Sequence, residues 1–83
     1  MPRRLIYSAH AETMLAERAI EREWVERTVF DPDAREADPV YPDRERAFRA
    51  LPERDGRVLR VVYVPGEDGF RIITMFLDRG RRR

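Results

Sequence analysis

One histidine, His10, is the residue of this 83-residue chain best suited to acid–base chemistry. The chain has no Cys, and all 17 of its basic residues are Arg, so no Lys can act as a nucleophile. Histidine is the side chain that ordinarily gains and loses a proton near neutral pH, and it can serve as a general acid or base. It can equally be a structural group that bonds to the first strand or to a carboxylate, and both interpretations stay open.

Arg18 is a second candidate, because it is a charge on an otherwise apolar helical stripe. Apolar residues recur at helical spacing over residues 11–19. His10 and Arg18 belong to one row of this predicted helix, with Met14 between them. A buried guanidinium without a partner is costly, so Arg18 needs an acid or a bound anion. The acid would be one on the sheet, such as Asp78, and the anion would be a phosphate.

The remaining candidates are arginines in the apolar segments of the second half of the chain. Guanidinium groups interleaved with aromatic rings suit RNA, because they pair with phosphates while bases stack. Arginines that lie at strand ends and reach toward solvent would give the same pattern. The set consists of Arg49, Arg57, Arg60 and Arg71, with Tyr63 close by and Arg79 at the end of the last strand.

Composition narrows the class of protein further. The net charge is +1, but residues 1–43 carry six Arg against ten acids (−4), and residues 44–83 carry eleven Arg against six acids (+5). This asymmetry predicts a basic face on the second half.

One His without Cys leaves only carboxylates as metal ligands, and no Gly-rich phosphate loop or dinucleotide motif occurs, so we predict no metal and no cofactor. No apolar run is long enough to span a membrane, and the first residues are too polar for a secretory signal, which favours the cytoplasm.

The elements that would position these residues can be placed by hydrophobic periodicity. Ser8 is a suitable N-cap for the first helix, and Asp31-Pro32-Asp33 ends the second. The Pro-containing stretch 33–43 is predicted to be an extended connector, and a turn is predicted at Pro52–Gly56. We predict strands at 5–7, 44–51, 57–64 and 70–77, with helices from residue 9 and over about 21–30.

This order predicts one α+β domain over residues 1–83. Two N-terminal helices would pack on a three- to four-stranded antiparallel sheet in the order β-α-α-β-β-β. The basic residues 79–83 would form a disordered tail. The last strands are apolar on both faces, so we expect the second face of the sheet to be partly uncovered and to receive a ligand or partner.

Several short motifs together resemble a bacterial family classed as a domain of unknown function and related to RelE-, ParE- and BrnT-type toxins of toxin–antitoxin pairs. The motifs are Ser8-x-His10-Ala11, Glu17-Arg18-x-Ile20, Trp24-Val25, Arg57–Tyr63 and Thr74-x-Phe76-x-Asp78-Arg79. The resemblance covers nearly the whole chain and implies a RelE-like fold. His10 and Arg18 match the family's His and second helix Arg, whereas Met14 stands where many members carry another Arg.

The resemblance implies a metal-independent endoribonuclease of the mRNA-interferase type and a cognate antitoxin. In that hypothesis His10, Arg18, Arg60 and Tyr63 are catalytic. His10 is the base or acid, the two arginines stabilise the phosphorane charge, and Tyr63 stacks or shares in proton transfer. The second set, Arg49, Arg57, Arg71 and Arg79, would bind RNA. The alternative is a non-catalytic module of the same fold that binds protein or RNA, and the sequence leaves open that it pairs with a second copy of itself.

Overall fold

The computed structural model describes residues 4–82, and the side chains of residues 4–81. It confirms an α+β fold with two helices. The elements in chain order are β1 (Arg4–Tyr7), α1 (Ala9–Glu17), α2 (Arg22–Phe30), β2 (Ala34–Ala37), β3 (Glu45–Leu51), the short helix η1 (Pro52–Arg54), β4 (Arg57–Pro65) and β5 (Gly69–Arg82).

The sheet is larger than the sequence predicts, and it is mixed. Its five strands lie in the order β1-β5-β4-β3-β2, and β1 runs parallel to β5 while the other pairs are antiparallel. Two corrections follow. Part of the predicted connector, between Pro32 and Pro39, is the edge strand β2, which pairs with β3 from Ala34↔Phe48 to Ala37↔Glu45. The second correction is that β1 pairs with β5, the last strand, rather than with a strand close to it in sequence.

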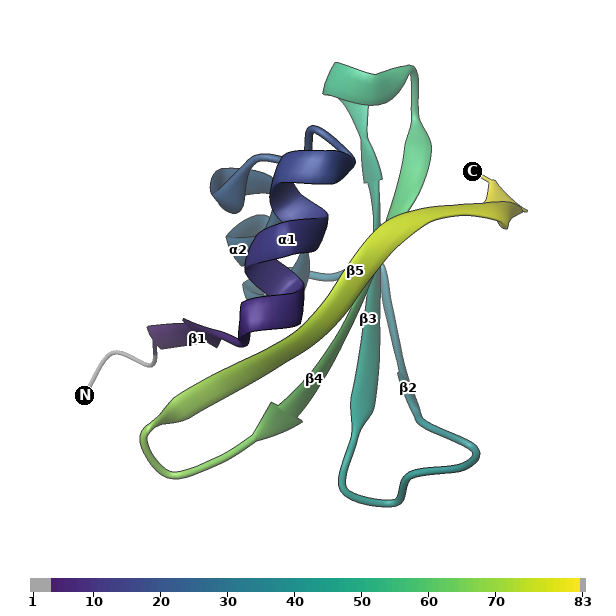
Figure 1. The fold of residues 1–83 in the computed structure, drawn as a ribbon. Coiled ribbons are helices and arrows are strands. Elements are labelled where there is room, and N and C mark those ends of the chain that lie inside the picture. The colour runs from purple at the N-terminus through teal and green to yellow at the C-terminus, as the bar shows by residue number, and fades with distance from the viewer. Residues whose placement is uncertain (1–3, 83) are drawn as a thin grey trace.

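Both helices cover one face of the sheet (Figure 1). The Ser8 side chain caps α1 as predicted and accepts a hydrogen bond from the Ala11 amide at 3.0 Å. Each helix turns its apolar stripe to the sheet, because the buried positions fall at helical spacing. These positions are Ala11, Met14 and Leu15 in α1, and Trp24, Val25, Thr28 and Val29 in α2.

The opposite face of the sheet, which we call the far face, is covered by arginine side chains, contrary to the expectation of an open apolar face. The Arg60 Cζ lies 5.0 Å from the Phe76 ring centre and 5.8 Å from that of Phe48. The Arg81 Cζ lies 3.7 Å above the same Phe48 ring, which is only 2 % exposed. Long arginine side chains can cover apolar surface while their charged ends stay in water.

The strand β5 is long enough to contact most of the other elements. Its register on β4 shifts between Val62↔Thr74 and Tyr63↔Ile72, so Ile73 is an extra residue that forms a β-bulge. The strand continues through Arg82, and Arg81 pairs with Glu36 of β2 at 2.7 Å. The predicted tail is therefore mostly part of the sheet, and Arg83 lies outside the described residues.

The helices described here are all too short or too polar to cross a membrane.

Candidate functional site

The first feature of the site is the line of contact between α1 and β5. β1 pairs with β5 only over Gly69–Ile72, and α1 packs against the part of β5 that follows. The His10 Nε2 is hydrogen-bonded to the Thr74 hydroxyl at 3.3 Å, and the Arg18 Nη1 donates to the Met75 carbonyl at 3.1 Å. The two side chains therefore meet neighbouring residues of one strand, although they lie eight positions apart on the helix.

The ring of Phe76 connects this line of contact to the far face. The Arg18 Cζ lies 5.8 Å from the Phe76 ring centre, and the Arg60 Cζ lies 5.0 Å from it. Arg60 is held by Asp78, with 3.4 Å between Nη1 and Oδ2. The structural partner suggested for Arg18 is therefore wrong: Asp78 pairs with Arg60, and Arg18 binds a backbone carbonyl.

A pocket of about 350 Å³ opens where α1 ends. We call it the basic pocket, and its lining residues are Arg18, Arg54, Arg57, Phe76, Leu77 and Arg79. The end of α1, η1 and the start of β4 lie at the same end of the molecule (Figure 1). Within residues 4–81, none of the four arginines forms a salt bridge, whereas six other arginines do.

The structure thus brings together three residues that the sequence assigns to two different roles. Arg18 was a candidate for catalysis, and Arg57 and Arg79 were candidates for RNA binding. Sequence reasoning missed Arg54, whose Nη1 donates to the Ala19 carbonyl at 3.4 Å. The available signal was the Arg54-Asp55-Gly56-Arg57 spacing, because a tight turn directs two flanking side chains to one end of a hairpin.

Tyr63 does not belong to this site. It lies on the helix-covered face and is 1 % exposed, and its hydroxyl donates to the Glu45 carboxylate at 2.9 Å. Burial, together with this hydrogen bond, raises the pKa of Tyr63 to about 12. The phenol therefore keeps its proton at neutral pH and stays out of reach of the Phe76 surface, so its proposed catalytic role is not supported by its position.

Arg49 and Arg71 are not among the residues that line the basic pocket. Arg49 Nη1 forms a salt bridge with Asp31 at 3.0 Å. Arg71 lines a second pocket, of about 240 Å³, at the turn between β4 and β5. Arg57 begins β4 and Pro65 ends it, so this second pocket is about 25 Å from the basic pocket at the usual rise of a strand.

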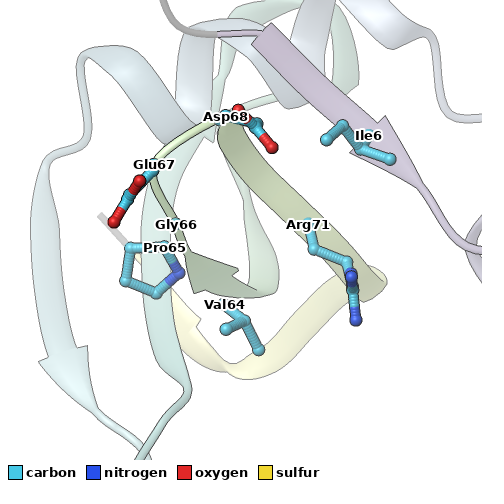
Figure 2. A pocket seen from close by; sticks show the side chains of 8 residues that line it. Ile6, Val64, Pro65, Gly66, Glu67, Asp68 and Arg71 are labelled. Atoms are coloured by element: carbon cyan, nitrogen blue, oxygen red, sulfur yellow. The ribbon is translucent and has the colours of Figure 1, made fainter.

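Figure 2 shows residues that line the second pocket, with Val64 and Arg71 on the strands and Glu67 and Asp68 on the turn that joins these strands. Ile6 of β1 closes one side. Its acidic and basic side chains are mixed, so it lacks the single sign of charge that the basic pocket has. No group of three potential metal ligands is found in the described part of the chain.

Comparison with protein families gives one match. The model of the family described as "Domain of unknown function (DUF4258)" matches residues 7–76. The chain belongs to the DUF4258 family. The matched region begins at the last residue of β1 and includes Phe76, so all of α1 and most of the α1–β5 contact lie within the family domain. Comparisons with curated proteins and with solved structures gave no match.

Proposed function

We propose that this DUF4258 domain binds RNA across the surface where α1 lies along β5, with the basic pocket holding phosphate. The observation that carries the proposal is the gathering of four arginines that have no carboxylate partner within the described residues. A guanidinium binds phosphate through two parallel hydrogen bonds, which makes arginine well suited to this ligand. A cluster of positive charges without acidic partners favours the binding of a polyanion.

The surface beside the pocket supplies the other chemistry that RNA binding uses. His10 is exposed at the start of α1, and the ring of Phe76 lies next to the guanidinium of Arg18. Imidazole, guanidinium and phenyl planes can all stack on unpaired bases. The arrangement therefore supports single-stranded RNA, whose bases are free to stack.

RNA binding is tested with a labelled single-stranded oligoribonucleotide and fluorescence anisotropy. The double variant Arg57→Gln/Arg79→Gln should bind at least about tenfold more weakly, because each lost charged hydrogen bond costs about 1.5–3 kcal/mol. The control for loss of positive charge is Arg44→Gln, which removes one charge, where the double variant removes two, from an arginine that lies over Tyr41 and outside the pocket. Failure of the unmodified protein to bind RNA, or equal losses in both variants, would refute the proposal.

RNA cleavage is the second candidate function, and the convergence of His10 and Arg18 on Thr74 and Met75 favours it. The reaction would be attack of a 2′-hydroxyl on the adjacent phosphorus, with departure of the 5′-oxygen. His10 would take the hydroxyl proton or give one to the leaving oxygen, and Arg18 would stabilise the charge on the phosphorane. Arg60 can contribute only if its bond to Asp78 opens.

Cleavage is tested separately from binding. Purified protein and its His10→Ala variant are incubated with RNA in the presence of a chelator, and the product ends are analysed. A cyclic 2′,3′-phosphate formed by the unmodified protein alone supports the enzyme. If the RNA stays equally intact with both proteins, the domain is a binding module and not a nuclease.

The toxin role is tested by the growth of cells that express each protein. Rescue of growth by a co-expressed neighbouring gene product tests for the antitoxin that the RelE-type resemblance implies.

A further inference from the structure

We infer that the basic pocket selects the terminal phosphate group of an RNA chain over the phosphodiesters of its backbone. The inference rests on the proposed function and states which part of the RNA the pocket takes. It follows from where the positive charge is concentrated and from what neutralises the rest of the surface.

Four carboxylates are next to the pocket's arginines in sequence, namely Glu17, Glu53, Asp55 and Asp78, and two of these four are bonded to groups outside the pocket. Glu53 precedes Arg54 and accepts two hydrogen bonds from Arg27, at 2.9 and 2.8 Å. Asp78 precedes Arg79; its Oδ2 is bonded to Arg60 at 3.4 Å and its Oδ1 accepts from the Gly80 amide at 2.9 Å. The other two, Glu17 and Asp55, form no salt bridge within the described residues, so none of the four acids neutralises an arginine of the pocket.

Two of the four guanidinium groups are held in place by the backbone. Arg18 donates to the Met75 carbonyl at 3.1 Å and Arg54 to the Ala19 carbonyl at 3.4 Å. A guanidinium has five N–H donors, so one bond to a carbonyl leaves the others for a ligand. The pocket therefore presents hydrogen-bond donors that are already in position. Binding loses less side-chain entropy, because these two arginines are held in place before the ligand arrives.

The arginines that could have extended the pocket into a track along the sheet do not do so. Arg49 and Arg60 are bonded to Asp31 and Asp78, and Arg71 lines a pocket at the other end of β4. A track of charges would fit successive phosphodiesters, each with one negative charge. A single cluster of four cations fits one group of higher charge, and a terminal phosphate carries about −1.5 to −2 at neutral pH.

The test compares RNA oligonucleotides of one sequence that differ only at their ends. They carry a 5′-phosphate, a 3′-phosphate or hydroxyls at both ends, and binding is measured at one fixed salt concentration. We expect one of the phosphorylated chains to bind about tenfold more tightly than the hydroxyl-ended chain, which is the value of one additional charged hydrogen bond. Arg57→Gln/Arg79→Gln should abolish this difference, and Arg44→Gln should keep it. Circular dichroism checks that both variants are folded.

The outcomes separate this inference from the proposed function. Equal binding of all three chains by the unmodified protein overturns end selection but leaves RNA binding intact, whereas no binding of any chain overturns the proposed function. A difference that persists in the double variant also overturns the inference, because the preference would then arise elsewhere. Inorganic phosphate is added as a competitor: if it binds as tightly as the preferred chain, the pocket is a general anion site and the assignment to RNA ends is wrong.

Discussion

The hydroxyl of Tyr63 shows how the position of a residue decides its role. The resemblance to RelE-type toxins placed Tyr63 among the catalytic groups, together with His10 and two arginines. The register of β4 turns it toward the helices instead, where it donates to Glu45. A strand sends successive side chains to opposite faces, so Tyr63 and Arg60 cannot share a face.

Tyr63→Phe is therefore expected to change stability and leave RNA binding unchanged. Removing the hydroxyl deletes its hydrogen bond to the Glu45 carboxylate, which should lower the free energy of unfolding by about 1–2 kcal/mol. Urea unfolding measures the first quantity and fluorescence anisotropy the second. If the folded variant binds RNA much more weakly than the unmodified protein, Tyr63 takes part in RNA binding and this prediction is wrong.

Glu53 should make the stability of the domain sensitive to acid. The hydrogen bonds from Arg27 lower the pKa of Glu53 from 4.5 to about 2. Because the folded-state pKa is the lower one, the pair stabilises the fold fully above about pH 4.5, and this contribution is lost as the pH falls toward 2.

The melting temperature of Glu53→Gln is thus expected to fall less than that of the unmodified protein over this acid range. Glu67→Gln is the control, since Glu67 forms no salt bridge with another described residue. If the two variants show the same pH profile, the Arg27–Glu53 pair does not contribute to acid sensitivity.

At the scale of elements, the sequence was sufficient for the helices and for the three long strands. Periodicity identified the buried faces of α1 and α2, and the apolar runs identified β4 and most of β5. The pattern of residues 44–51 is ambiguous, and the strand there was predicted because the next two strands need an antiparallel neighbour. Periodicity missed β2, because Pro32 and Pro39 flank a strand of only four residues, Ala34–Ala37. Parallel pairing of β1 with β5 is a long-range contact, and local patterns carry no signal for it.

The candidate site was predicted in part for a related reason. The residue types that bind phosphate can be read from the sequence, so Arg18, Arg57 and Arg79 were found. Which arginines are neutralised depends on tertiary neighbours. Arg49 and Arg60 gave the same sequence signal, yet Asp31 and Asp78 bind them. Side-chain pairing of this kind is fixed only by the fold.

Gly69 is the residue on which the pairing of β1 with β5 depends most closely. It adopts a φ of +144°, and a Cβ at this position would lie 2.2 Å from the Arg4 carbonyl oxygen. Gly69→Ala should therefore displace β1 and lower the free energy of unfolding. Backbone strain accounts for about 1–3 kcal/mol of this loss. Gly80→Ala in the same strand is the control, because its nearest contact would be an ordinary 3.5 Å. Equal urea midpoints for the two variants would contradict this account.

At the scale of the whole molecule, a net charge of +1 means that the pocket, rather than a general positive field, must attract RNA. A terminal phosphate in the pocket counts as about two neutralised charges, so the logarithm of the binding constant should fall with the logarithm of salt concentration with a slope of about −1.5. Raising the salt from about 50 to 200 mM should then weaken binding about eightfold. A slope near zero would show that the arginines do not contact phosphate, and a slope twice as steep would show a larger footprint.

The pairing of β1 with β5 also determines when the domain can be completed during synthesis. The Ser8 hydroxyl donates to the Ile73 carbonyl, and these residues are 65 positions apart. β1 is synthesised before β5 and therefore finds its partner only after residues 69–72 have been translated. Contacts of such long range slow folding. A nascent chain that stops before Gly69 would keep β1 unpaired, so we expect premature termination before this residue to yield a product that proteases remove, rather than a smaller working domain.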